Sequence, residues 1–204
     1  MKSNSLPVVA LGASAGGIQA LIEFFSHVSP KLNVAFVVVT HLKRDSISVL
    51  DQILARNTTM PVSWSTENQV LEPNHVYILP VSKYMTLENG KFQLMDRDPL
   101  KKANKAIDIF FQSLANDKDG KSIGIIFSGA GSDGTQGAIH MHQQGGLVMA
   151  QDPATAEIDS MPQWAIMKDH VQVVLSPKEL AKTLPKVLVG QETQQSKPTR
   201  SQGS

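Results

Sequence analysis

A glycine-rich turn near the amino terminus constrains this chain more than any other stretch. The short apolar run 8–11 leads directly into Gly12-Ala13-Ser14-Ala15-Gly16-Gly17. Five apolar residues then follow at helical spacing: Ile18, Leu21, Ile22, Phe25 and Val28. We expect Ser29-Pro30 to end that helix. The segment predicts a strand, a tight turn and a helix, with Ser14 between strand and helix.

Two kinds of site use a turn of this type. A dinucleotide-binding turn requires G-x-G-x-x-G, but Ser14 occupies the second glycine position and no Walker lysine follows, which weakens the phosphate-binding alternative. The same residues match G-x-S-x-G, in which small neighbours place a nucleophilic serine on a sharp turn beside helix amides. The pattern is short, so a serine that only caps the following helix remains an alternative.

Composition excludes several classes of function. The 204 residues, 41% of them hydrophobic, are enough for one substantial core and few for two. Nineteen basic and eighteen acidic side chains give a net charge of +1, so no long-range field favours nucleic acid or an anionic membrane. Cysteine is absent, and no apolar run reaches the roughly 18 residues of a spanning helix. We therefore expect a cytoplasmic protein with no nucleic-acid partner and no membrane insertion.

Strand and helix patterns alternate along the rest of the chain. Extended segments are predicted at 34–40, 61–64, 76–80, 122–127, 147–151 and 171–175. Helical segments are predicted at 49–54, 107–114, 135–144, 161–168 and from 177 onward. Between them, Asn89-Gly90 joins two short strands and suits a type I′ turn. The pattern favours an α/β fold, with a doubly wound, mainly parallel sheet, helices on both faces and one inserted β-hairpin.

The composition changes near the carboxyl terminus. Residues 190–204 are rich in Gln, Ser, Thr and Pro and contain almost no apolar side chain. Such a segment cannot bury enough surface to fold by itself. We therefore expect one domain over residues 7–189 and a disordered tail or linker over residues 190–204.

Three residues with useful chemistry fall at the carboxyl ends of predicted strands, where doubly wound sheets bind ligands. Ser14 follows the first strand, His41 follows the second, and Asp133 lies in a second glycine-rich turn, residues 128–134. They supply a nucleophile, a base and an orienting carboxylate, so we expect His41 within about 2.6 to 3.2 Å of both partners. For each residue taken singly an alternative remains: a solvated strand end for His41, and the N-cap of the next helix for Asp133. The other histidines are scattered and predict no metal site.

Five ordered stretches give the chain a resemblance to the catalytic domain of the CheB-type chemotaxis receptor methylesterases. They are residues 12–17, 38–41, 72–80, 128–134 and 150–156. The resemblance maps the family's triad onto Ser14, His41 and Asp133, and places the oxyanion between the amides of Ala15 and the Ala130 turn. It implies an enzyme without cofactor that hydrolyses γ-glutamyl methyl esters on the cytoplasmic helices of methyl-accepting chemoreceptors. Deamidation of certain receptor glutamines is implied as well.

Some positions depart from the stand-alone enzymes of that family. Ala15 replaces a threonine, Ala130 a methionine and Lys43 a proline, and Ala103-Asn104-Lys105 replaces a basic stretch that contains proline. Ala15 and the Gly-Ser-Asp-Gly turn are more similar to proteins that fuse the methylesterase to a CheR-type methyltransferase. We therefore expect a CheR-type methyltransferase domain as a partner in the same or a longer chain. A non-catalytic signalling module with the same fold is the alternative if these changes close the site.

Overall fold

The computed structural model describes residues 6–41, 48–98, 100, 103–118, 122–168 and 170–195, with side chains up to residue 190. Its main strands are β1 (Val8–Ala13), β2 (Ala35–Thr40), β3 (Val62–Trp64), β4 (His75–Ile78), β7 (Ser122–Ile126), β8 (Leu147–Gln151) and β9 (Val173–Leu175). They form one sheet in the order β3-β4-β2-β1-β7-β8-β9. Every neighbouring pair in it is parallel. The prediction of a doubly wound, mainly parallel sheet is confirmed.

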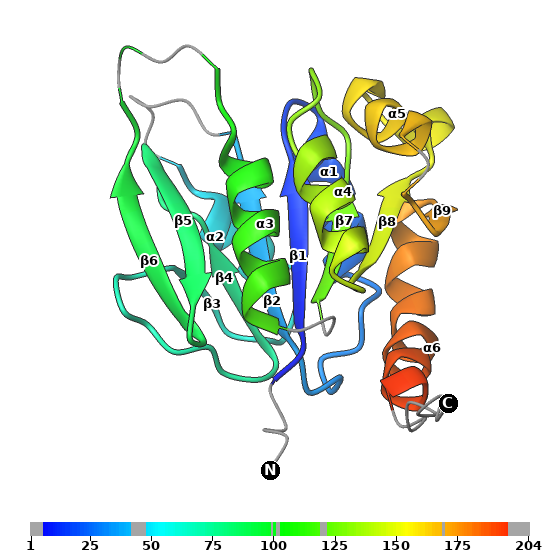
Figure 1. Cartoon of the computed structure of the whole chain (residues 1–204), viewed down its shortest axis with the longest axis horizontal. Coiled ribbons are helices and arrows are strands. Elements are labelled where there is room, and N and C mark those ends of the chain that lie inside the picture. The colour runs from blue at the N-terminus through cyan, green and yellow to red at the C-terminus, as the bar shows by residue number, and fades with distance from the viewer. Residues whose placement is uncertain are drawn as a thin grey trace, which may run out of the picture.

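Helices cover both faces of this sheet (Figure 1). One face carries α1 (Gly17–Phe25), α2 (Leu50–Ala55) and α6 (Pro177–Gln195). The other carries α3 (Ala106–Lys118) and α4 (Thr135–Gln143). The short α5 (Ser160–Met167) and the 3-10 turn η1 (Pro153–Thr155) follow β8 at the carboxyl end of the sheet. Both layers of helices point their amino ends toward that edge, because a helix between two parallel strands must run antiparallel to them.

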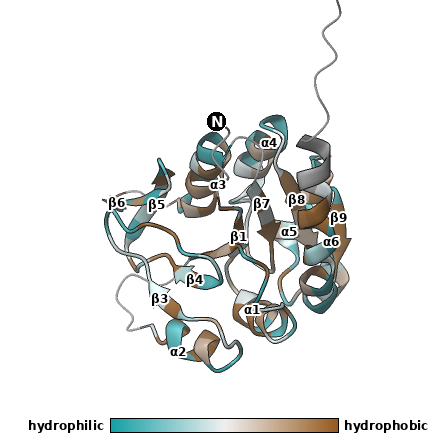
Figure 2. Cartoon of the chain, turned by 90° about the horizontal axis from the view of Figure 1, so that it is seen from below, coloured by the Kyte–Doolittle hydropathy of each residue, from teal (hydrophilic) through white to brown (hydrophobic). Residues whose placement is uncertain are grey.

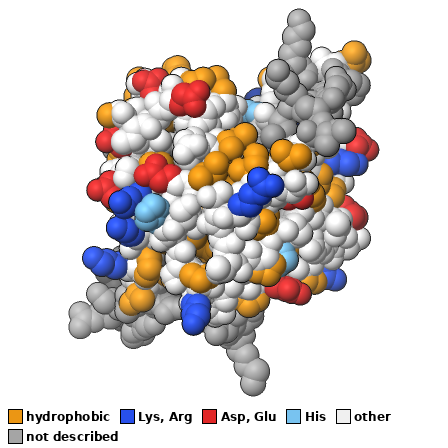
Figure 3. Space-filling view, turned by 180° about the vertical axis from the view of Figure 1, so that it is seen from behind, with side chains coloured by type: hydrophobic (Ala, Val, Ile, Leu, Met, Phe, Trp, Pro, Cys, Tyr) orange, Lys and Arg blue, Asp and Glu red, His pale blue; other side chains and the backbone are white. Residues whose placement is uncertain are grey.

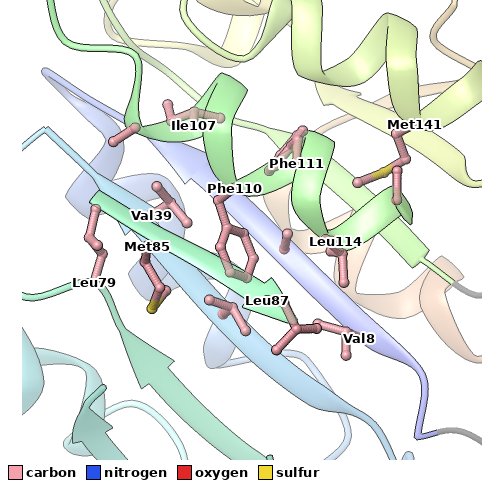
Figure 4. Close-up of a cluster of buried hydrophobic side chains, with 14 of the residues drawn as sticks. Val8, Val39, Leu79, Met85, Leu87, Ile107, Phe110, Phe111, Leu114 and Met141 are labelled. Atoms are coloured by element: carbon pink, nitrogen blue, oxygen red, sulfur yellow. The ribbon is translucent and has the colours of Figure 1, made fainter. Parts of the chain in front are cut away.

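The central strands are continuous apolar runs because helices cover them on both sides. All residues of β1, β2 and β7 are buried. Figure 2 shows β1 and β8 in brown, the hydrophobic end of the scale, in the interior, while hydrophilic teal segments occur on the surrounding helices α1, α4 and α6. On the α3 side, Phe110, Phe111 and Leu114 contribute to a cluster that also contains Val8 of β1 (Figure 4). This packing fixes α3 against the middle of the sheet.

The predicted hairpin is present as β5 (Lys83–Glu88) and β6 (Lys91–Asp96). Asn89 and Gly90 both have positive φ, 52° and 73°, as a type I′ turn requires. The hairpin forms a separate two-stranded sheet that packs on α3 and does not join the main sheet. Its edge is tied to α3 by a hydrogen bond from the Leu87 N–H to Ser113 Oγ at 3.0 Å. The inserted hairpin therefore lies beside α3 and covers the side of that helix.

Two local expectations are corrected by the structure. Helix α1 ends at Phe25, and Ile18 is 41% exposed because Ala20, Leu21, Phe24 and Phe25 form the sheet-facing stripe. Helix α6 continues to Gln195, so the first six residues of the expected tail, 190–195, are helical. Residues 196–204 lie outside the described part of the chain.

The surface of the described residues carries charges of both signs. Figure 3 shows acidic and basic side chains both present across the face opposite α3 and α4. Among the helices described, none is long and apolar enough to span a bilayer.

Candidate active site

Three adjacent strands, β2, β1 and β7, bring the predicted triad together at one edge of the sheet. Ser14 directly follows β1, His41 directly follows β2, and Asp133 lies in the turn between β7 and α4. Because these strands are parallel neighbours, their carboxyl ends meet. Residues far apart in sequence therefore share one site.

The Ser14 turn is held by backbone contacts and by glycines. The Ser14 N–H donates to the Ser128 carbonyl at 3.0 Å, and the Ser14 carbonyl accepts from the Gly17 N–H at 2.9 Å. Gly16 adopts the left-handed conformation with φ 74° and is the N-cap of α1, where no side chain provides a cap. The alternative in which the Ser14 side chain caps α1 is therefore wrong. A Cβ on Gly129 would lie 2.8 Å from the Ser14 Cβ, so this glycine leaves room for the serine.

His41 bridges the other two residues. Its Nδ1 lies 3.2 Å from Ser14 Oγ, and its Nε2 lies 2.6 Å from Asp133 Oδ2. Both distances fall within the expected range. The carboxylate can only accept, so it selects the tautomer with the proton on Nε2 and leaves the Nδ1 lone pair facing the serine hydroxyl. The imidazole and carboxylate are 16% and 6% exposed, so solvent competes little with their hydrogen bond.

Asp133 accepts four hydrogen bonds from the described residues. Oδ2 receives His41 Nε2 and the Ile107 N–H at 3.0 Å, and Oδ1 receives the N–H groups of Asp108 and Gly134, each at 3.0 Å. Ile107 and Asp108 lie in the first turn of α3, so Asp133 caps α3 and receives the favourable end of its dipole. The alternative in which Asp133 caps only the following helix, α4, is therefore wrong.

Glycines let α3 approach the triad. A Cβ on Gly12 would lie 2.6 Å from the Ile107 side chain, and a Cβ on Gly134 would lie 2.8 Å from it. Gly134 also has φ 93°, a conformation that favours glycine. The glycines of the two turns therefore admit Ile107, whose amide reaches Asp133.

Asp108 is a site residue that sequence reasoning missed. Its Oδ1 accepts the N–H groups of Gly134 and Gly137, both at 2.9 Å, and its side chain is buried beside Asp133. Burial raises the pKa of the Asp108 carboxyl, and the charge of Asp133 and a hydrogen bond with it raise the pKa further, against the two glycine amides. The sequence signal, an acid in the first turn of a helix, is common and indicates only a favourable helix dipole.

Two backbone amides near Ser14 are free for an oxyanion. Within the described residues, neither the Ala15 nor the Ala130 N–H donates a hydrogen bond. The Gly129 N–H is engaged instead, because it donates to the Ile158 carbonyl at 2.9 Å. The Ala15 and Ala130 amides, the expected oxyanion donors, thus have no other acceptor among the described residues.

A pocket of about 450 Å³ opens beside His41 and Asp133. It is lined by Gly131, Ser132 and Asp133 of the second glycine-rich turn. Trp164 of α5 and Lys168, just after that helix, line it as well. Ala103, Asn104 and Lys105, the stretch that departs from the stand-alone enzymes, form another wall. Ala130 and the stretch 103–105 therefore leave this pocket open beside His41, whereas Lys43 lies outside the described residues. In the described part of the chain, no group of His, Asp and Glu has the arrangement of a metal site.

Comparison with known proteins identifies the family. The model of the CheB methylesterase family matches residues 9–184, most of the chain. The chain belongs to the CheB methylesterase family. It is similar over 90% of its length to the CheB methylesterase catalytic domain of Thermotoga maritima, with a TM-score of 0.84, 27% identity and 99% of that domain covered.

Curated relatives agree with this assignment. A protein of Leptospira interrogans is 30% identical over 174 residues, which cover 85% of this chain and 90% of the relative. Protein-glutamate methylesterase/protein-glutamine glutaminase 3 of Shewanella oneidensis is 32% identical over 163 residues, 78% of this chain. The match covers 46% of that relative, so the chain spans about half the length of some family members.

Proposed function

We propose that this chain is a serine esterase that hydrolyses γ-glutamyl methyl esters on the cytoplasmic helices of methyl-accepting chemoreceptors, and deamidates certain glutamines there. The observation that supports this most directly is His41, which lies within hydrogen-bonding distance of both Ser14 and Asp133. The names of the relatives supply the substrate class, since they are protein-glutamate methylesterases and protein-glutamine glutaminases.

In the first half of the reaction, Ser14 Oγ attacks the ester carbonyl while His41 Nδ1 accepts the hydroxyl proton. Asp133 stabilises the imidazolium that forms. The negative charge on the tetrahedral intermediate lies between the Ala15 and Ala130 amides, which donate to it. The intermediate collapses when His41 returns the proton to the methoxy oxygen, and methanol leaves a glutamyl ester on Ser14.

In the second half, a water molecule attacks the acyl-enzyme while His41 accepts its proton. The new intermediate uses the same two amides, and His41 protonates Ser14 Oγ as the free glutamate leaves. With a glutamine substrate, ammonia replaces methanol as the first leaving group and the same glutamate results. The pocket reaches two members of the triad, His41 and Asp133, and the turn residue Ala130, which favours the enzyme over the non-catalytic signalling module.

The test combines active-site labelling with turnover. A fluorophosphonate probe reports an activated serine, and methanol release from a methylated chemoreceptor fragment reports the substrate. We expect wild type to label and to release methanol, and Ser14→Ala to do neither. Ser29→Ala is the matched control, because Ser29 is exposed in the loop between α1 and β2, at the amino ends of the strands.

The outcomes separate the parts of the proposal. If wild type is labelled but releases no methanol, the triad is supported and the chemoreceptor substrate is refuted. Absence of labelling in a folded wild-type protein refutes catalysis and favours the signalling module. Labelling that persists in Ser14→Ala refutes Ser14 as the nucleophile.

A further inference from the structure

The amino ends of α3 and α4 cap each other through two carboxylates. Asp133, just before α4, accepts the Ile107 and Asp108 N–H groups of α3. Asp108, in the first turn of α3, accepts the Gly134 and Gly137 N–H groups at the start of α4. Capping by acidic side chains stabilises helix amino ends. Here the exchange also fixes the position of the carboxylate that contacts His41.

The close approach of the two helices is built into the sequence. A Cβ on Gly137 would lie 2.6 Å from the Phe111 Cβ and 3.0 Å from the Asp108 Cα. Any larger residue at Gly137 would push the start of α4 away from α3. The glycine therefore serves the contact between Asp108 and the α4 amides.

The two carboxyl groups are too close to share the site as two anions without cost. Asp108 is 9% exposed and Asp133, whose carboxylate is 6% exposed, is its neighbour. Both amide hydrogen bonds to Asp108 end on Oδ1, which leaves Oδ2 for a proton. A hydrogen bond between the two carboxyl groups requires that one of them be protonated. Asp133 already accepts four donors, so it is the better anion.

We propose that Asp108 is a positioning residue of the triad: a neutral carboxylic acid that donates its proton to Asp133 and holds the turn of Asp133 against α3. This inference rests on the proposed function. The donated hydrogen bond gives the Asp133 carboxylate a further partner that holds it in place, so that it faces His41 and stabilises the imidazolium that forms. Asp108 does not touch the substrate, and it acts through Asp133.

The other charged groups around Asp108 are few among the described residues. His41 is reached through Asp133, and Lys105 and Lys168 line the same pocket. Helix α4 presents Thr135 and Gln136 to that pocket, neither of which titrates. Asp133 is thus the partner whose charge sets the protonation of Asp108.

Two substitutions separate a neutral acid from an anion. Asp108→Asn reproduces the protonated side chain, because its oxygen accepts from Gly134 and Gly137 and its NH₂ group donates to Asp133. Asp108→Ala removes both functions. Asp117→Asn is the control, since Asp117 is a second buried carboxylate of α3 that accepts a backbone amide, from Gly90, at the far end of the helix.

The measurements are kcat and KM for a methyl ester across pH, and the NMR titration of the His41 ring in each variant. We expect Asp108→Asn to keep kcat within about threefold of wild type and to leave the His41 titration midpoint unchanged. Asp108→Ala should lower kcat about 10- to 100-fold with little change in KM, because the displaced Asp133 no longer orients His41. Asp117→Asn should leave kcat and the midpoint unchanged.

Other results overturn the proposal. If Asp108 is an anion, Asp108→Asn removes a negative charge near His41 and lowers its titration midpoint by about one pH unit. A fully active Asp108→Ala, or an Asp108→Asn as impaired as Asp108→Ala, also contradicts it. If Asp108→Ala does not fold, the His41 titration midpoint of Asp108→Asn alone tests whether Asp108 is neutral. If wild type neither hydrolyses the ester nor is labelled, the proposed function is refuted. The His41 titration then still tests the protonation state proposed for Asp108.

Discussion

Replacing Asp133 by asparagine tests the triad and the helix cap together. The carboxylate uses both oxygens, one for His41 and Ile107 and one for Asp108 and Gly134, whereas asparagine has a single oxygen. The amide oxygen is expected to face Asp108 and Gly134, where two N–H donors need an acceptor. The NH₂ group then faces His41 and Ile107.

This orientation has two consequences whose size follows from the contacts. The NH₂ group forces the proton of His41 onto Nδ1, so the ring can no longer accept from Ser14, and kcat should fall about 10⁴-fold, as in a serine-protease triad with the wrong tautomer. The unpartnered Ile107 amide costs about 1 to 3 kcal/mol. Loss of the charge at the amino end of α3 adds roughly 0.3 to 1 kcal/mol. At about 2 to 4 °C per kcal/mol, the summed cost predicts a fall in Tm of roughly 3 to 16 °C.

The assay pairs methanol release and fluorophosphonate labelling with thermal unfolding. Asp152→Asn is the control, because Asp152 also follows a strand at the carboxyl edge but uses Oδ1 only for the Ala154 N–H, at 3.0 Å. Asparagine caps as well as aspartate there, so activity and Tm should hold. An Asp133→Asn enzyme that retains a tenth or so of wild-type kcat/KM would refute the tautomer argument. An unchanged Tm would refute the cap.

Four further outcomes are expected. Ser14→Ala and His41→Ala should each abolish nearly all methanol release, and the double variant should lose no more, since the triad acts as a unit. Gly129→Ala places a Cβ in steric clash with Met161 Sδ and 2.8 Å from the Ser14 Cβ, so both side chains must move and labelling should slow about 100-fold, with urea unfolding used to show that the variant folds. Because the pKa of Asp108 is raised in the folded state, that state retains a proton that the unfolded chain releases above the ordinary value of 3.8. The free energy of unfolding should therefore fall as pH rises from there to the folded-state pKa, and urea titrations of Asp108→Asn should lack this decrease. Gly90→Ala, at φ 73°, should cost about 1 to 2 kcal/mol in thermal unfolding and leave kcat unchanged.

Local sequence determined the elements of the sheet and the turns that end them. Buried runs such as Ala35–Thr40 have few alternatives to a strand covered on both faces, and Asn89-Gly90 carries its turn type in its own conformational preferences. The parallel topology then places every strand's carboxyl end at one edge. For this reason Ser14, His41 and Asp133 were predictable as neighbours without any knowledge of their contacts.

Helix packing was less predictable, because it depends on which side chains meet across layers. The helical spacing in α1 correctly placed Leu21 and Phe25 in the buried stripe, but Ala20 and Phe24 join them in place of Ile18 and Ile22. Phe24 is held there by edge-on contacts with Phe36 and Phe127, which are distant in sequence. The hairpin was identified, but its position on α3 depends on contacts of Leu87 and Ser113 that are distant in sequence.

The sequence alone therefore determined the α/β fold, the edge that holds the site and the three residues placed there, because these follow from short-range patterns and from the geometry of parallel strands. Only the tertiary structure determined what surrounds them. Asp108 is an ordinary first-turn acid until α4 brings the Gly134 and Gly137 amides within 2.9 Å of it. The pocket likewise needs residues of α5, of the start of α3 and of the Asp133 turn beside His41. Such contacts are set by the packing of several elements at once, and a single segment of sequence carries no record of its distant partners.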